Sequence, residues 1–287
     1  MDAVKASQLT KTFINSATNK PVTALSGISL TAKTNQLTAL TGPDGAGKTT
    51  FMRLVCGLVK QDGGDLFVLG RDVSADPQSV QDRLSYMPQR FGLYEDLSVQ
   101  ENLNLYADLH SIPAKDRSAR FTKLLSMTGM LPFTGRLAGK LSGGMKQKLG
   151  LACTLVRIPE LLLLDEPSIG LHQRENDRLI RSLKELRDLG NTVIVVEHDE
   201  DMMRAADWII DIGPKAGRKG GEVVFQGTPK EMLKSHTITA DYLNGDRRID
   251  VPSERRKGNG KHIRIFGARG NNLKHVDVDF PLGKLIV

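Results

Sequence analysis

Glycines and a lysine between positions 42 and 50 are spaced to bind phosphate. The segment GPDGAGKTT fits the pattern G-x-x-x-x-G-K-[ST] and directly follows an apolar stretch at residues 37–40, which is the context the pattern needs. Its glycines let the backbone curl until successive N–H groups point at phosphate oxygens, and a helix that begins here adds its positive end. We predict that Lys48 reaches the β- and γ-phosphates of a nucleotide and that Thr49 holds Mg²⁺. The predicted binding residues are Gly42, Pro43, Asp44, Gly45, Ala46, Gly47, Lys48, Thr49 and Thr50.

Two carboxylates follow the apolar run at residues 161–164. Asp165 is expected at the end of a strand beside the phosphate loop, where it can order Mg²⁺ and its water shell. Glu166 can polarise an attacking water, and we predict it as the general base.

Polar residues elsewhere complete a site for phosphoryl transfer. Gln89, in YMPQ, is expected in a loop where its amide senses metal and water, and His198 follows the apolar residues 192–196 and can orient the nucleophile. The segment LSGGMKQ places the Ser142 hydroxyl and the amides of Gly143 and Gly144 at a helix start, which suits a γ-phosphate. The predicted catalytic residues are Lys48, Gln89, Glu166 and His198, and the predicted metal ligands are Thr49, Gln89 and Asp165.

The composition is that of a globular protein without a membrane span. The 287 residues are 39% hydrophobic and 25% charged, and aliphatic runs such as residues 161–164 are far shorter than a bilayer-crossing helix. The first twenty residues lack the apolar middle of a signal peptide. We therefore expect a cytoplasmic protein that is peripheral to the inner membrane only through a partner. Cys56 and Cys153 have apolar neighbours and no metal-ligand spacing, which predicts buried free thiols.

Hydrophobic spacing predicts a chain that alternates between sheet and helix. Period-two and fully apolar runs predict strands, with hairpins among the first three. The expected strands are residues 4–9, 22–30, 37–40, 65–69, 161–164, 192–196, 208–212 and 222–226. Helices are expected at residues 49–58, 175–189 and 229–233, and helical spacing over residues 101–130 predicts a helical subdomain.

The end of the chain repeats an earlier pattern. At a constant offset, Leu273 falls on Leu25, Val276 on Ile28, Val278 on Leu30, Leu285 on Leu37 and Val287 on Ala39. This predicts the start of a second nucleotide-binding unit that stops before its phosphate loop, with a chance similarity of hairpins as the alternative.

Basic residues at positions 247–269 supply much of the net charge of +7. We interpret them as a solvated linker, the alternative being contact with nucleic acid or anionic lipid.

In this order and spacing, the motifs resemble the ATP-binding cassette (ABC) ATPase family over nearly the whole chain, and LSGGMKQ is highly specific to it. The resemblance implies an α/β P-loop NTPase fold: a nucleotide-binding domain with an antiparallel β subdomain, a mainly parallel core sheet and a helical subdomain. It implies ATP and Mg²⁺ as the bound groups. It also implies that Phe13 stacks on adenine, where relatives often carry Tyr. Ser142 and Gly144 would act on nucleotide held by the opposite subunit of a head-to-tail homodimer.

The chain resembles two different kinds of ABC protein on the two sides of the strand that ends at Asp165. Residues 1–167 look like the ATP-binding subunit of ABC-2 type exporters, close to the YbhF type, as in GPDGAGKTTFMRLVCGL and LSYMPQRFGLYEDLSVQENL. Residues 168–287 are similar to UvrA of bacterial nucleotide excision repair, as in SIGLHQREN, IDIGPKAG and GARGNNLKHVDV. His172 stands where exporter ATPases usually have Asp and UvrA proteins have His. We interpret the chain as a hybrid, whether natural, engineered or computationally generated.

We expect residues 1–245 to be the nucleotide-binding domain, with its helical subdomain at about residues 90–140, and residues 246–287 to be a basic linker and the truncated second unit.

Three functions follow from these resemblances. Because the region at 89–140 is of exporter type, the first hypothesis is a dimeric subunit that hydrolyses ATP to energise an integral membrane exporter. The second is a UvrA-like repair ATPase fragment that binds DNA through its basic end. The third is a nucleotide-binding module with little turnover.

Overall fold

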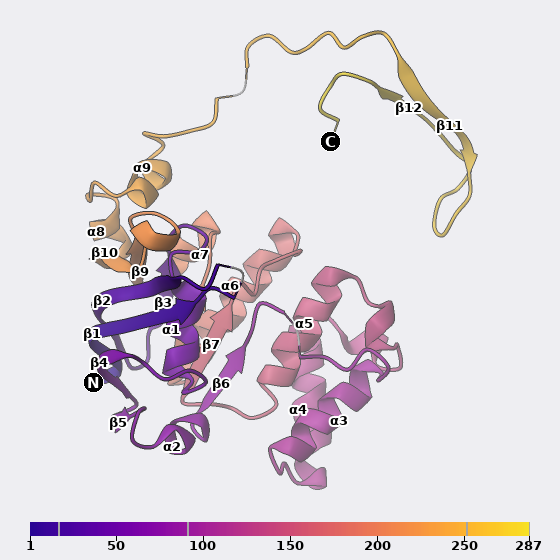
Figure 1. Ribbon diagram of the computed structural model, residues 1–287. Helices are drawn as coiled ribbons and strands as arrows, with labels where there is room; N and C mark the ends of the chain where they lie inside the picture. The colour runs from indigo at the N-terminus through magenta and orange to yellow at the C-terminus, as the bar shows by residue number, and fades with distance from the viewer. Residues whose placement is uncertain (17, 91, 251, 287) are drawn as a thin grey trace. The chain divides into compact units, whose positions relative to one another are not determined.

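Apolar strands build two β-sheets in the larger of two units of the chain (Figure 1). The computed structural model describes residues 1–16, 18–90, 92–250 and 252–286, and it divides into Met1–Asp246 and Arg247–Val287, which are described separately. The strands of the first unit are β1 (Asp2–Ile14), β2 (Pro21–Lys33), β3 (Leu37–Thr41), β4 (Gly63–Val68), β5 (Arg71–Asp72), β6 (Leu84–Met87), β7 (Leu161–Asp165), β8 (Thr192–Val196), β9 (Trp208–Gly213) and β10 (Glu222–Gly227). Its α-helices are α1 (Lys48–Val55), α2 (Pro77–Gln81), α3 (Val99–Leu109), α4 (Ala114–Met127), α5 (Gly143–Thr154), α6 (Gln173–Asp188), α7 (Glu200–Ala205), α8 (Pro229–Met232) and α9 (Ile238–Asn244). Short 3-10 turns are η1 (Leu131–Phe133), η2 (Ala138–Lys140) and η3 (Gly217–Lys219).

The central sheet is mainly parallel, in the strand order β10-β9-β3-β8-β7-β6. Strands β7 and β8 are buried along their whole length, as continuous apolar runs predict for a sheet covered on both faces. Helix α6 connects them, which confirms the predicted strand–helix–strand unit. The hairpin expected for β3 is wrong, because β3 pairs in parallel with β8 and β9. Its residues LTALT are buried on both sides, which suits the centre of a sheet.

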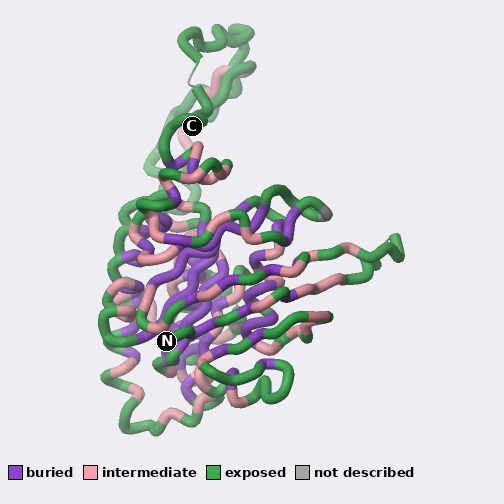
Figure 2. The backbone as a smooth tube through the Cα atoms, turned by 90° about the vertical axis from the view of Figure 1, so that its left-hand side faces the viewer, coloured by how far each residue is buried: buried purple, intermediate pink, exposed green. Residues whose placement is uncertain are grey.

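The second sheet is antiparallel, in the order β2-β1-β4-β5. It confirms the expected hairpin of the first two strands, although both are longer than predicted. Buried stretches of backbone gather at the centre of this unit (Figure 2). The alternating side chains of the central strands divide the core in two. Leu163 and Ile194 pack with α1 and the antiparallel sheet, whereas Leu164 and Val195 pack with α3 to α7. Each such buried side chain stabilises the fold by about 1.5–3 kcal/mol.

Helices α3, α4 and α5 lie together beside the central sheet (Figure 1). Helices α3 and α4 confirm the helical pattern predicted for residues 101–130. Helix α3 begins at a capping box: Glu101 N donates to Ser98 Oγ at 3.2 Å, and Ser98 N donates to the Glu101 carboxylate at 2.7 Å. Within the described residues, no helix combines the length and apolar character needed to cross a bilayer.

The second unit is an antiparallel pair of strands, β11 (His262–Ala268) and β12 (Val276–Pro281). It confirms strands in this region, and Val278 pairs with Ile265 in the register. Apolar side chains of the pair are nonetheless accessible, since Ile263 is 56% exposed and Phe266 is 73% exposed. The predicted match of Val287 to Ala39 lies outside the described residues.

Candidate functional site

The phosphate-binding pattern forms a tight loop between β3 and α1. Gly42, Gly45 and Gly47 have φ values of 129°, 75° and 109°, where a side chain would strain the backbone. A Cβ on Gly42 would also lie 1.9 Å from the Ile212 carbonyl oxygen. Gly47 caps α1 without a side-chain hydrogen bond. The first N–H groups of the helix, where Thr49 and Thr50 lie, are thus left for a ligand.

Lys48 is held inside this loop. Its ammonium donates to the carbonyl oxygens of Gly42 at 2.7 Å and Pro43 at 3.0 Å, and lies 3.7 Å from the Asp44 carboxylate. Burial lowers the pKa of Lys48, and nearby carboxylates, Asp44 first, oppose that effect. A buried ammonium that rests on carbonyl oxygens is placed to bind a stronger acceptor such as a phosphate.

Asp165 lies at the end of β7, as predicted, with its side chain buried. Its Oδ2 accepts a 3.4 Å hydrogen bond from the Tyr86 hydroxyl, and its carboxylate is hydrogen-bonded to Thr49. Its Oδ1 has no hydrogen-bond partner among the described residues. Burial raises the pKa of Asp165, against the effect of the Thr49 hydrogen bond.

An unpartnered buried carboxylate oxygen beside a hydroxyl fits a hard cation, because Mg²⁺ prefers oxygen ligands. Asp165 and Thr49 would hold it. When bound, Mg²⁺ would neutralise charge on the phosphate oxygens of a nucleotide.

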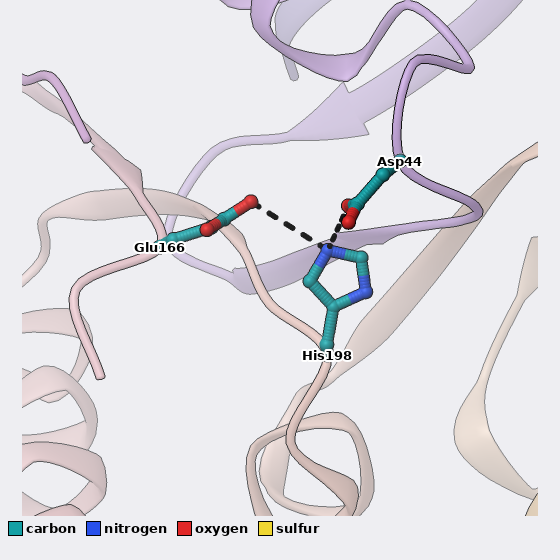
Figure 3. Close-up of side chains that lie close together, drawn as sticks. All are labelled: Asp44, Glu166 and His198. Atoms are coloured by element: carbon teal, nitrogen blue, oxygen red, sulfur yellow. Dashed lines mark ion pairs between the residues drawn. The ribbon is translucent and has the colours of Figure 1, made fainter. Parts of the chain in front are cut away.

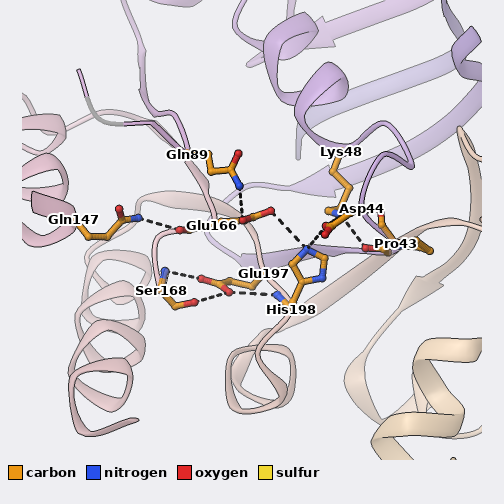
Figure 4. A network of polar contacts seen from close by, with 10 residues as sticks. Pro43, Asp44, Lys48, Gln89, Gln147, Glu166, Ser168, Glu197 and His198 are labelled. Carbon is orange, nitrogen blue, oxygen red and sulfur yellow. Dashed lines mark hydrogen bonds and ion pairs between the residues drawn. The ribbon is translucent and has the colours of Figure 1, made fainter. Parts of the chain in front are cut away.

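Glu166 contacts Gln89 from the loop after β6 and Gln147 from helix α5 (Figure 4). Its Oε2 accepts a 2.7 Å hydrogen bond from Gln89 Nε2, and its carbonyl oxygen accepts one from Gln147 Nε2 at 2.9 Å. Its φ of 53° is unusual for a residue with a side chain, and such strain is often found at functional positions. The structure therefore brings together Gln89 and Glu166, which the sequence predicted as catalytic residues.

His198 joins the same group from the end of β8 (Figure 3). Its Nε2 lies 3.6 Å from Glu166 Oε1 and 3.3 Å from Asp44 Oδ1. Ligand atoms of these three side chains all lie within 4.8 Å of one another. Asp44 was predicted only as a loop residue that binds nucleotide, so its contact with His198 is new information from the structure. The Asp44 carboxylate thus lies close to both Lys48 and His198, which the sequence predicted as catalytic residues.

The signature segment begins α5. Ser142 caps this helix by accepting a 3.4 Å hydrogen bond from Met145 N, and Gly143 and Gly144 form the first turn. A Cβ on Gly144 would lie 2.6 Å from the Gly170 carbonyl oxygen. Among the described residues, Ser142 makes no hydrogen bond to the phosphate loop.

Phe13 lies near the end of β1 with 41% of its surface exposed. The Lys11 ammonium lies 5.4 Å from the ring centroid, within the range of a cation–π contact. An aromatic ring with accessible surface suits the predicted stacking on a base.

A second glycine-rich loop donates hydrogen bonds to carbonyl oxygens of the phosphate loop. The sequence did not predict this contact. Between β9 and β10, Gly217 N donates to the Gly45 carbonyl oxygen at 3.0 Å, and Gly221 N donates to the Ala46 carbonyl oxygen at 2.9 Å. A Cβ on Gly220 would lie 3.1 Å from Ala46 Cα. The sequence signal is the glycine content of GPKAGRKGG, between the strands predicted at residues 208–212 and 222–226.

Comparisons with known proteins agree with this geometry. The sequence model described as ABC transporter matches residues 25–169. The chain is 49% identical over 211 residues to UvrABC system protein A of Lactiplantibacillus plantarum, and 51% identical over 208 residues to that of Streptococcus pneumoniae serotype 4. These matches cover 69% and 68% of the chain, and the chain spans 22% of each relative. The similarity to UvrA thus extends over more of the chain than residues 168–287.

Solved structures share the fold. The dimeric post-hydrolysis state of the ATP-binding cassette MJ0796 bound to ADP and Pi matches with a TM-score of 0.71 at 25% identity, over 79% of this chain and 98% of that one. The cbiO1 subunit from Clostridium perfringens matches with a TM-score of 0.68 at 25% identity, over 81% of this chain and 91% of that one. An Atm1-family ABC exporter with ATP bound shares the fold with a TM-score of 0.73 at 21% identity, over 88% of this chain and 43% of that one.

The α/β P-loop fold, the loop geometry and the family match all lead to one assignment. The chain belongs to the ABC transporter family and has the fold of the ATP-binding cassettes.

Proposed function

We propose that this cassette uses ATP hydrolysis to energise the membrane domain of an exporter. The observation that carries the proposal is a groove of about 550 Å³ between β6 and α3, lined in part by Tyr86, Pro88, Tyr106 and Leu109. The groove adjoins Gln89, whose amide bonds to Glu166. A segment of a membrane protein seated there would thus lie next to the candidate catalytic group.

The groove also has polar lining. Ser85 and Arg157 are among its lining residues. Such a lining suits a partner segment that brings polar groups of its own. In this proposal the cassette is cytoplasmic and peripheral to the inner membrane.

The catalytic part of the proposal assigns roles within the site. Lys48 and the loop hold the phosphates, Glu166 is the base, and His198 and Gln89 orient the reacting groups. Asp165 and Thr49 would hold Mg²⁺, and the predicted third ligand, Gln89, would contribute its amide oxygen. Because Ser142 caps its own helix and makes no hydrogen bond to the loop in the described residues, we propose that it acts on nucleotide in a second, head-to-tail copy. The dimeric state of the cassette MJ0796 supports a dimer.

Leu109→Glu is expected to release the chain from its membrane partner. Leu109 lines the groove and is 68% exposed, so a carboxylate there folds without strain but opposes an apolar contact. We expect the amount of membrane protein that co-purifies to fall at least about tenfold, the size of an interface hot spot, while basal ATP hydrolysis is unchanged. Leu189→Glu, on a residue 72% exposed that does not line the groove, is the control. Equal recovery of membrane protein with both variants would contradict the proposal.

A UvrA-like ATPase fragment that binds DNA is the second candidate. Identities of 49–51% to UvrA proteins over more than two thirds of the chain favour it, and residues 252–262 are exposed and include four cationic side chains. Under this candidate, the chain binds double-stranded DNA with an affinity that falls steeply as salt rises. Salt-sensitive DNA binding together with no recovery of membrane protein would favour this candidate over the exporter subunit.

Removing residues 246–287 should leave ATP binding intact and improve solubility. The candidate site lies wholly within the first unit, and the second unit exposes Ile263 and Phe266 on a strand pair. Exposed strand pairs without a covering layer are marginally stable and prone to associate. The measurements are the ATP dissociation constant and the soluble yield of the truncated and complete chains. A truncated chain that no longer binds ATP would show that the second unit completes the nucleotide domain.

A further inference from the structure

Glu197 is a buried carboxylate that the proposed chemistry does not use. It is 2% exposed and lies between β8 and His198. Its Oε1 accepts a 2.9 Å hydrogen bond from Ser168 N, and its Oε2 accepts from Ser168 Oγ at 2.8 Å and from His198 N at 3.3 Å (Figure 4). Within the described residues, no side-chain cation lies within 4.0 Å of it. Burial raises the pKa of Glu197, and the hydrogen bonds from Ser168 and His198 oppose that effect, so these three contacts are what stabilise the carboxylate.

The register of the sheet explains why Glu197 reaches Ser168. Strands β7 and β8 are neighbours, with Asp165 opposite Val196, and Glu166 N donates to the Val196 carbonyl oxygen at 3.1 Å. The segments that follow the two strands therefore leave the sheet side by side. Glu197 directly follows Val196, the last paired residue of β8, and connects the two segments through its hydrogen bonds with Ser168.

The segment after Glu166 also touches the signature helix. The Gly170 carbonyl oxygen packs against Gly144 so closely that a Cβ there would lie 2.6 Å away, and Gln147 of α5 donates to the Glu166 carbonyl oxygen. Residues 166–170 are thus held by α5 at both ends and by Glu197 between them. A shift of α5 would move Ser168, and through Glu197 it would move the backbone of His198.

We propose that Glu197 is a positioning residue that couples residues 168–170 to His198, and so sets His198 against Glu166 for hydrolysis. The inference rests on the proposed roles of Glu166 and His198. It predicts that Glu197 acts on the rate of turnover more than on ATP binding, because it contacts none of the phosphate-loop residues through the hydrogen bonds described.

Glu197→Gln tests the coupling with little change of shape. If the new amide nitrogen takes the place of Oε1, Ser168 N loses its acceptor. If it takes the place of Oε2, His198 N loses its acceptor. We expect kcat to fall at least about tenfold, the lower part of the range for losing a hydrogen bond to a charged group, with the ATP dissociation constant changed by less than about threefold. Ser168→Ala, which keeps the carboxylate, should lower kcat by a smaller factor. The double variant should be close to Glu197→Gln alone, because both changes break the same link.

Asp207→Asn is the control for a purely structural effect. Asp207 also accepts a backbone hydrogen bond, from Leu37 N at 2.8 Å, but at the opposite end of the strands. We expect both carboxylate variants to lower the melting temperature and only Glu197→Gln to lower kcat. Unchanged kcat in Glu197→Gln, or an equal loss in Asp207→Asn, overturns the inference. If Glu197→Gln does not fold, unchanged kcat in Ser168→Ala overturns it. Normal turnover in Glu166→Gln and in His198→Ala would instead overturn the proposed roles.

Discussion

Lys48→Ala should reduce ATP affinity below the measurable range. Lys48 carries the ammonium that rests on the Gly42 and Pro43 carbonyl oxygens at the centre of the loop. A phosphate would replace these neutral acceptors with a charged one, so that both partners of the contact carry charge and attract each other electrostatically. Alanine removes both the charge and the donors. Titration calorimetry with ATP and Mg²⁺ measures the loss.

The control for this prediction is Lys60→Ala, which removes an exposed lysine just after α1. It should leave ATP affinity unchanged. Burial lowers the pKa of Lys48, so the charged side chain is less favourable in the folded site than in water. Lys48→Ala should therefore remain folded, which a melting curve without nucleotide will check. Tight ATP binding by a folded Lys48→Ala chain would overturn the assignment of the loop.

The strands and the polar residues at their ends could be predicted because their signals are local. The runs LLLL at residues 161–164 and VIVV at residues 193–196 are apolar at every position, which fits strands buried on both faces. Parallel neighbours end at the same edge of a sheet, so residues that follow β7 and β8, such as Glu166 and His198, can meet there. The distance of 3.6 Å between His198 Nε2 and Glu166 Oε1 agrees with that reasoning.

Contacts between loops could not be predicted from spacing. The hydrogen bonds from Gly217 and Gly221 to the phosphate loop join positions about 170 residues apart in sequence, and a glycine turn gives no sign of what it will face. The contact between Asp44 and His198 could not be predicted either, because it depends on the position of the phosphate loop relative to β8. The sequence also could not distinguish a hairpin strand from the central strand β3, since both are short apolar runs.

Glu166→Gln should lower ATP hydrolysis at least about a hundredfold, the usual contribution of a general base, while ATP binding persists. The amide has the same length, and its oxygen can accept the 2.7 Å hydrogen bond that Gln89 Nε2 now donates to Glu166 Oε2. The backbone contacts with Gln147 and Val196 are unchanged by the substitution. Only the ability to take a proton from water is lost. Steady-state hydrolysis and ATP affinity, measured on the same preparation, separate the two effects.

A chain that binds ATP but cannot hydrolyse it should accumulate as a dimer. If Ser142 acts on nucleotide held by a second copy, bound ATP joins the two subunits, and hydrolysis is what releases them. Glu166→Gln should therefore elute as a dimer with ATP and Mg²⁺ and as a monomer without nucleotide, by size-exclusion chromatography with light scattering. Glu185→Gln, on the helix α6 and outside the hydrogen-bonded group around Glu166, is the control and should behave as the unmodified chain. Turnover at the normal rate in Glu166→Gln would place the base elsewhere, and His198, 3.6 Å away, would be the next candidate.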